Sequence, residues 1–219
     1  MDGMSSITWF VFETMGIIAF SFSGAMVGIA RRMDIFGITV LSVLTAVGGG
    51  MVRDVMAGIV PPSVLRAPSG LILSVATAIF VFVGYEFIRI SGTRKKWITV
   101  LYHISDTIGL ACFTVTGVLT ARYTYPEYTV TLPVMLGLIT AAGGGILRDI
   151  MAQRIPVVLK TDVYALASII GAFITCFAWP VMGPALASWA GFAAVIILRV
   201  LAICYHWQLP HAHTRRRQI

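Results

Sequence analysis

The sequence predicts an all-helical integral membrane protein with seven transmembrane helices, built as two inverted three-helix repeats followed by a seventh helix. Three observations predict this fold: the composition, the number of apolar stretches and an internal repeat. Of the 219 residues, 58% are hydrophobic and 11% are charged, and the mean hydropathy is +0.90. A soluble domain carries about 25% charged residues, so this chain has more apolar surface than an aqueous fold can bury.

Seven apolar stretches are long enough to cross a bilayer, which takes about 20 residues of helix. They cover residues 7–30, 35–60, 69–90, 98–122, 131–153, 163–182 and 184–205. The boundary between the last two depends on the short segment WPVMGPA. The N-terminus lacks the basic segment of a signal peptide, so the first stretch is expected to remain as a span.

Basic residues predict the orientation, because lysine and arginine are enriched in cytoplasmic loops. One side of the predicted spans carries most of them: Arg31, Arg32, Arg89, Arg94, Lys95, Lys96, Arg154, Lys160, Arg215, Arg216 and Arg217. The other side carries Arg66 and Arg122. The N-terminus is therefore expected outside the cell and the C-terminus in the cytoplasm, which requires an odd number of spans. The same distribution explains the net charge of +7 without a nucleic acid as partner.

The internal repeat is carried by two pairs of matching segments. TAVGGGMVRDVMAG at 45–58 recurs as TAAGGGILRDIMAQ at 140–153, and ETMGIIAFSFSG at 13–24 is matched by DTIGLACFTVTG at 106–117. Each unit holds three spans, and an odd number of spans inverts the second copy. We therefore expect a first repeat over 1–92, an inverted repeat over 93–183, and a seventh helix with a basic cytoplasmic tail over 184–219.

Each copy of the motif places three glycines inside a predicted span: Gly48, Gly49, Gly50, Gly143, Gly144 and Gly145. Three glycines destabilise a helix by about 2–3 kcal/mol relative to alanines. An opened helix exposes carbonyl groups, which coordinate cations, and it is tolerated in a membrane only within protein or beside a wet cavity. We expect the second and fifth helices to be kinked at the glycines and to line an ion pathway. Close helix packing by small residues is a compatible alternative.

An arginine and an aspartate follow the glycines in both copies: Arg53, Asp54, Arg148 and Asp149. A charge at the centre of a span costs at least about 2.5 kcal/mol, so these residues need partners. Adjacent residues on a helix point about 100° apart. We therefore expect each arginine to pair with the aspartate of the other copy, or with Glu13 or Asp106. Such charges serve either as bridges between the repeats or as the lining of a pathway.

Other polar residues give less specific signals. Thr45 and Thr140, one turn before the glycines, offer hydroxyl groups either to a permeant ion or to their own helix backbone. Arg199 is expected to extend to the cytoplasmic interface as an anchor. The chain has no phosphate-binding loop, and no histidine lies deep in a span to activate a serine. We expect no enzyme, no cofactor and no bound metal beyond permeant monovalent cations.

The doubled GGG-x-x-R-D motif, in two three-span units with a seventh span, resembles the prokaryotic TRIC family of trimeric intracellular cation channels over nearly the whole chain. The resemblance implies a homotrimer in a prokaryotic cell (inner) membrane, in contact with lipid. Each protomer would carry its own pore for monovalent cations, mainly potassium, along the kinked second and fifth helices. The glycine triplets would line it, with the arginine and aspartate of each motif just beyond. The sequence lacks the lysine-rich lipid-binding motif of the animal members. A secondary transporter of a small amino acid such as glycine is the alternative, because inverted repeats with broken helices are also typical of transporters.

Overall fold

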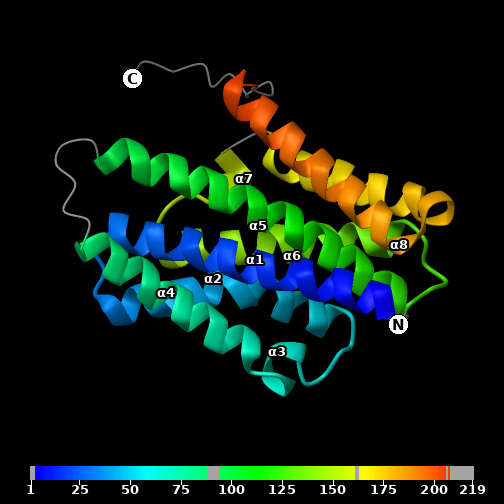
Figure 1. Ribbon diagram of the computed structural model, residues 1–219, viewed down its shortest axis with the longest axis horizontal. Coiled ribbons are helices and arrows are strands. Elements are labelled where there is room, and N and C mark those ends of the chain that lie inside the picture. Colours follow the sequence, from blue (N-terminus) through cyan, green and yellow to red (C-terminus); the bar gives the residue numbers. More distant parts are fainter. Residues whose placement is uncertain (1–2, 88–93, 161–162, 206, 208–219) are drawn as a thin grey trace, which may run out of the picture.

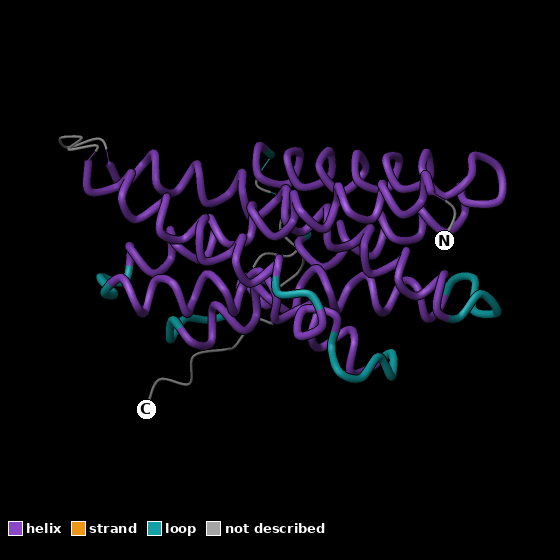
Figure 2. The backbone as a smooth tube through the Cα atoms, turned by 60° about the horizontal axis from the view of Figure 1, so that its bottom comes forward, coloured by secondary structure: helices purple, strands orange, loops and turns teal. Residues whose placement is uncertain are grey.

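The computed structural model describes residues 3–87, 94–160, 163–205 and 207, and every regular element within these ranges is a helix. Six helices are long and apolar enough to cross a membrane: α1 (Gly3–Ala30), α2 (Ile35–Met56), α4 (Ser69–Phe87), α5 (Arg94–Thr124), α6 (Thr131–Met151) and α8 (Tyr164–Cys204). Two one-turn helices, α3 (Ser63–Arg66) and α7 (Val157–Lys160), lie between them. Figure 2 shows the long helices running along a common direction, as expected for a membrane protein.

The helix α8 contains both of the last two predicted spans. Its 41 residues include Pro180 and Pro184, and Gly183 between them has the non-helical angles φ 75° and ψ 169°. A positive φ of this kind favours glycine. Figure 1 shows the chain reversing direction within α8, so that its two segments lie side by side. The expected boundary in WPVMGPA therefore coincides with a sharp break inside one assigned helix.

Four helices form the centre of the bundle. The helix α1 packs against α2 and α5, and α6 packs against the same two helices. The helix α4 covers α1 and α2, whereas α8 covers α5 and α6. In Figure 1 α1 and α5 run in opposite directions. The two halves of the chain therefore contribute equivalent helices to an antiparallel centre.

The contact between α1 and α5 uses the same positions of both sequence copies. A Cβ atom on Gly16 would lie 2.7 Å from the ring of Phe113, and a Cβ atom on Gly109 would overlap the ring of Phe20. The two rings stack edge to face, with their centroids 5.1 Å apart. Gly16 and Gly109 are matching positions of the repeat, as are Phe20 and Phe113, so the contact is reciprocal.

The glycine triplets do not open the helix backbone. Both α2 and α6 are α-helical without interruption through Gly48–Gly50 and Gly143–Gly145. The expected carbonyl and amide ends at mid-helix are therefore not observed, and a bend of the helix axis at these positions stays a prediction.

The glycines instead allow the backbones of α2 and α6 to touch. A Cβ atom on Gly49 would overlap the carbonyl oxygen of Thr140, and a Cβ atom on Gly144 would overlap that of Thr45. This is again a reciprocal contact between matching positions. Any larger side chain would force the helices apart, so close packing is the structural use of the glycines in this conformation.

Candidate functional site

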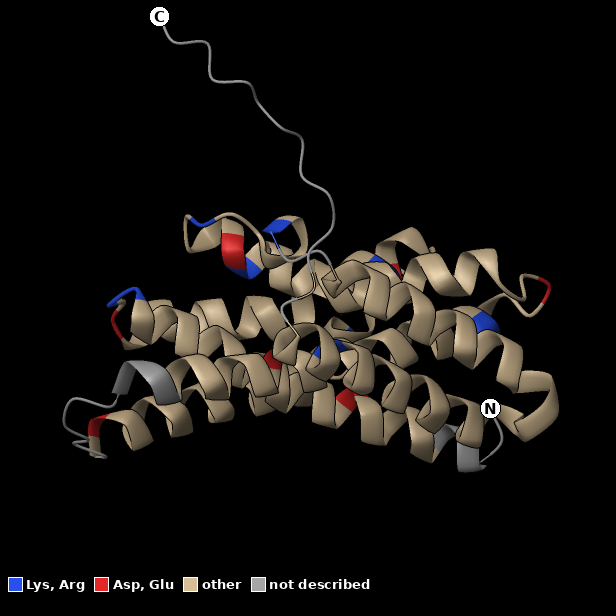
Figure 3. Ribbon diagram, turned by 90° about the horizontal axis from the view of Figure 1, so that it is seen from above, with Lys and Arg blue, Asp and Glu red and all other residues tan. Residues whose placement is uncertain are grey.

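The arginine and aspartate of each motif lie at the C-terminal ends of α2 and α6, inside the protein. Arg53, Asp54, Arg148 and Asp149 have at most 2% of their surface exposed. Figure 3 shows charged residues within the bundle as well as at its loops. Buried charges require partners, so their contacts define the candidate site.

Each arginine pairs first with its own neighbour in sequence. Arg53 Nε donates to Asp54 Oδ1 at 2.9 Å, and Arg148 Nε donates to Asp149 Oδ1 at 2.8 Å. The expected pairs Arg53–Asp149 and Arg148–Asp54 are therefore wrong. Both helices end two residues after the aspartate, and a long arginine side chain can fold back over this last turn despite the angle between adjacent residues.

The second oxygen of each aspartate binds the start of the following short helix. Asp54 Oδ2 accepts a hydrogen bond from the Ser63 backbone amide at 2.7 Å. Asp149 Oδ2 accepts one from the Val157 amide at 2.8 Å. Ser63 and Val157 are the first residues of α3 and α7, whose initial N–H groups have no partner within the helix. Each motif thus fixes the loop that follows it.

The expected alternative partners are found within each repeat. Arg148 Nη1 donates to Asp106 Oδ1 at 2.5 Å, with both side chains fully buried. In the first repeat Arg53 Nη1 lies 4.0 Å from Glu13 Oε2, which is too long for a hydrogen bond. Both expected acids thus lie near the arginine of their own repeat, but only Asp106 is in hydrogen-bond contact with its arginine.

A hydroxyl group from the other repeat accompanies each carboxylate. Ser23 on α1 contacts both Arg148 Nη1 and Asp106 Oδ1. Thr116, the matching residue on α5, interacts with the carboxylate of Glu13. The motif spacing had not singled out Ser23, although its alignment with Thr116 marks both positions as small hydroxyl residues.

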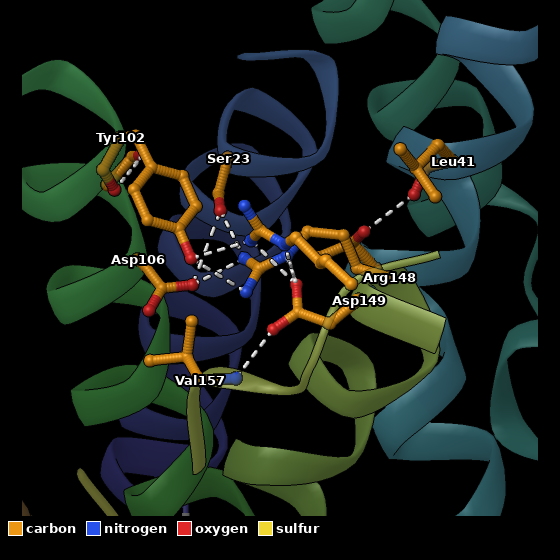
Figure 4. Close-up of polar contacts among 10 residues, drawn as sticks. Ser23, Leu41, Tyr102, Asp106, Arg148, Asp149 and Val157 are labelled. Carbon is orange, nitrogen blue, oxygen red and sulfur yellow. Dashed lines mark hydrogen bonds and ion pairs between the residues drawn. The ribbon is translucent and has the colours of Figure 1, made fainter. Parts of the chain in front are cut away.

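Two further residues enclose the Arg148 side chain. Arg148 Nη2 and Arg154 Nη2 both donate to the hydroxyl of Tyr102, at 3.0 and 2.9 Å. Arg154 also donates to Asp149 Oδ1 at 2.6 Å. Figure 4 shows the carboxylates of Asp106 and Asp149 and the ring of Tyr102 converging on Arg148. The sequence had placed Arg154 in a cytoplasmic loop and gave no signal for Tyr102.

A cavity of about 380 Å³ adjoins the Arg53 side chain, between α1, α2, α3 and α4. Its polar lining includes Glu13, Arg53, Asp54, Ser63 and Ser69, and the remainder is mostly apolar. Within the described part of the chain, neither Glu13 Oε2 nor Arg53 Nη1 has a hydrogen-bond partner. The two atoms are buried behind the cavity wall, and the part of the Glu13 side chain that remains exposed, 20%, belongs to a residue that lines the cavity.

Thr45 and Thr140 do not direct their hydroxyl groups to a pathway. Each hydroxyl donates to a carbonyl oxygen one turn earlier in its own helix: Thr45 to Leu41 at 2.6 Å and Thr140 to Leu136 at 2.5 Å. Both side chains are fully buried. The backbone use expected as the alternative is the one observed.

Arg199 does not extend to an interface, contrary to expectation. It is 1% exposed, and its guanidinium lies 4.6 Å from the ring centroid of Tyr164. Its helix segment lies at the edge of the bundle, where α8 folds back at Gly183, and Arg199 is on the face that packs against the bundle. The basic residues Arg89 and Arg215–Arg217, used to predict orientation, lie outside the described residues.

The described charged residues form no metal centre. Among the residues with described side chains, no three histidine, cysteine or acidic groups come together in a way that would hold a metal ion. The site offers buried ion pairs and hydroxyl groups on helices from both repeats. This arrangement suits the passage or binding of small charged solutes.

Comparison with known proteins places the chain among bacterial membrane proteins. A family model described as glycine transporter matches two segments, residues 10–86 and 103–180. The UPF0126 inner membrane protein YadS of Escherichia coli strain K12 is 34% identical over 200 residues, covering 90% of this chain and 93% of that protein. The UPF0126 membrane protein YvgT of Bacillus subtilis strain 168 is 32% identical over 213 residues, covering 95% and 98%.

Solved structures share the whole fold. A prokaryotic TRIC channel crystallised in 0.5 M KCl is 32% identical, with a TM-score of 0.84, and the match covers 93% of this chain and 100% of that chain. The TRIC trimeric intracellular cation channel orthologue from Rhodobacter sphaeroides is 30% identical, with a TM-score of 0.79 and coverage of 91% and 98%. These neighbours are ion channels and not enzymes, in agreement with the sequence prediction.

Proposed function

The chain belongs to the prokaryotic TRIC channel family, and on that premise we propose that it conducts potassium or other monovalent cations across the cell membrane. The observation that carries the proposal is the placement of paired buried charges on two matching helices, within the fold of solved cation channels. A buried ionisable residue in a span is costly, and it typically marks a route for ions.

We propose that the pore of each protomer runs along α2 and α6. Its lining would comprise Thr45, Gly48, Gly49, Gly50, Arg53, Asp54, Thr140, Gly143, Gly144, Gly145, Arg148 and Asp149. The backbone contact at Gly49 and Gly144 seals the two helices together in this conformation. Conduction then requires α2 and α6 to separate or bend at the glycine triplets. Glycine has no side chain, so the backbone there has more conformational freedom to change this contact.

The proposed channel has seven spans, with the two segments of α8 counted separately. The reciprocal contacts of α1 with α5 and of α2 with α6 support an inverted pair of repeats over 1–92 and 93–183, followed by residues 184–219. The proposed orientation has the N-terminus outside and the C-terminus in the cytoplasm. By likeness to its solved relatives, the assembly is proposed to be a homotrimer surrounded by lipid.

Recording from purified protein in planar bilayers tests the proposal. We expect unitary currents in potassium chloride, and a reversal potential in a potassium gradient that follows the cation and not chloride. Substituting sodium for potassium on one side measures the selectivity. Preparations that give no unitary current, while a solved TRIC channel reconstituted in parallel conducts, would contradict the channel.

Secondary transport of glycine is the second candidate, favoured by one observation. The cavity beside α2 is lined by Arg53, whose charge suits a carboxylate, and by Glu13, whose charge suits an ammonium group. A transporter would give saturable glycine uptake into proteoliposomes, coupled to an ion gradient and without unitary currents. The channel predicts the reverse result in the same preparation.

A further inference from the structure

The two ends of the proposed route carry opposite formal charge. The first charge cluster, Glu13, Arg53 and Asp54, has two carboxylates and one guanidinium, a formal charge of −1. The second charge cluster comprises Asp106, Arg148, Asp149, Arg154 and Arg199. It has three guanidiniums and two carboxylates, a formal charge of +1. The matching residues of the two clusters carry the same charges, and Arg154 and Arg199 make the second cluster positive.

The first charge cluster faces the cavity of about 380 Å³ and holds an incompletely bound acid. Both oxygens of Asp54 are occupied, Oδ1 by Arg53 and Oδ2 by the Ser63 amide. Glu13 interacts with Thr116, but its Oε2 lies 4.0 Å from Arg53 Nη1 and accepts no hydrogen bond from the described residues. Arg53 is 2% exposed and its Nη1 is likewise unpartnered beside the cavity. The Glu13 side chain is 20% exposed and the Asp54 side chain 2%, so Glu13 is the more accessible acid of this cluster.

In the second charge cluster, Tyr164 lies beside Gly145, the glycine that matches Gly50. Tyr164 is 1% exposed, and its hydroxyl oxygen would lie 3.3 Å from a Cβ atom on Gly145. At the matching Gly50, a Cβ atom would meet only the side chain of Arg53. Tyr164 is the first residue of α8, and Ser69 is the first residue of α4. In the first repeat, the small Ser69 lines the open cavity. In the second repeat, the Tyr164 ring occupies the matching place.

Arg199 adds a positive charge behind this ring. Its guanidinium lies against the face of Tyr164, and its Nε and Nη1 have no hydrogen-bond partner within the described ranges. In the first repeat, α4 supplies no basic residue to the cavity lining. A cation approaching the second charge cluster therefore meets both a side chain in its way and a repulsive charge.

We infer that the two ends of the route have different roles: a monovalent cation binds at Glu13 in the open cavity, and Tyr164 with Arg199 forms the barrier at the other end. This inference rests on the proposed cation channel. Low-dielectric walls strengthen the field of a single uncompensated carboxylate, so one charge is sufficient to concentrate cations there. The asymmetry also predicts that current is larger when cations enter from the cavity side.

The charge at Glu13 is tested with Glu13→Gln, which preserves the shape of the side chain. At low ionic strength we expect its conductance to fall on the order of tenfold, with the rectification reduced and the difference shrinking at high salt. Glu127→Gln is the matched control, because Glu127 is exposed and outside the cavity lining. Equal conductance for parent and Glu13→Gln at low salt would overturn the inference.

The cavity and the barrier are tested by one substitution at the start of α4 and one at Arg199. Ser69→Tyr is expected to fill the cavity. It should lower the low-salt conductance as Glu13→Gln is expected to do, although the Glu13 carboxylate is retained. Arg199→Gln is expected to raise the conductance and weaken the rectification, since it removes the repulsive charge without removing the Tyr164 ring. Unchanged rectification in both variants would overturn the assignment of the barrier.

Cation binding is also measured without current, which separates the inference from the channel itself. The midpoint of thermal unfolding in detergent is expected to be higher in potassium chloride than in choline chloride for the parent, and equal in the two salts for Glu13→Gln. If the parent gives no currents but its unfolding midpoint is higher in potassium chloride, the proposed channel function is wrong and the cation site at Glu13 is supported. If glycine, and not potassium, stabilises the parent through Glu13, the cavity binds a zwitterion and the inference is overturned.

Discussion

At the scale of single residues, matching arginines of the repeat have different ionic surroundings. Arg148 contacts Asp106 directly at 2.5 Å, whereas Arg53 lies 4.0 Å from Glu13 beside a cavity. Asp106 is fully buried, and the Glu13 side chain is 20% exposed. Removing one partner of a buried pair leaves an uncompensated charge, so the two acids should differ in their contribution to stability.

We therefore predict that Asp106→Asn destabilises the protein by about 3–5 kcal/mol, and that Glu13→Gln costs much less. Both substitutions remove one negative charge and keep the side-chain shape. Arg148 would lose a charged acceptor at hydrogen-bond distance, while Arg53 would lose only a distant one. Unfolding in a denaturing detergent series measures both variants. Equal destabilisation would mean that the two pairs are equally strong, contrary to the observed distances.

The sequence identified these charged residues but not the partners of each. The cost of charge in a span indicated that Arg53 and Arg148 need acids, and Glu13 and Asp106 were among those expected. The direct pairing of Arg53 with Asp54 was excluded on the angle between adjacent residues. That angle describes where side chains leave the backbone, and it does not fix where a long, flexible arginine side chain ends. Near the end of α2, the Arg53 guanidinium can therefore fold back to reach Asp54.

At the scale of helices, the centre of the bundle depends on backbone contact between α2 and α6. Gly49 touches the Thr140 carbonyl, and Gly144 touches that of Thr45. The repeated triplet predicted a special role for both helices, and close packing was one of the two expected uses. The short helices α3 and α7 could not be predicted from periodicity, because each is one turn long and begins where a distant aspartate side chain binds it.

We predict that Gly49→Ala destabilises the protein by about 1–3 kcal/mol through overpacking, and that it lowers the conductance by changing how α2 and α6 meet. Gly84→Ala on α4 is the control, because a Cβ atom there would meet nothing within 4 Å. It is expected to be neutral or slightly stabilising, since alanine favours a helix over glycine. Thermal unfolding and bilayer recording of both variants check this. Loss of stability in Gly84→Ala alone would contradict the packing contact.

At the scale of the whole molecule, one chain supplies both charge clusters and all four central helices. The composition and the doubled motif were sufficient to predict a membrane protein of this family. The division of the last apolar region was also predicted, because prolines and a glycine mark the break in α8. The cavity was not predictable, because it depends on which residue begins α4 and how far that side chain extends.

A pore contained in one protomer predicts independent conduction by the subunits of a trimer. Parent and Glu13→Gln chains with different affinity tags can be co-expressed and trimers of mixed composition purified. Each Glu13→Gln subunit should remove the same increment of low-salt conductance, because no subunit shares its route with another. A single pore on the threefold axis would instead place three Glu13 side chains around one route, and the first substitution would change every conductance level. Counting the levels in each mixed preparation distinguishes the two arrangements. Equally spaced levels that scale with the number of parent subunits are the expected result.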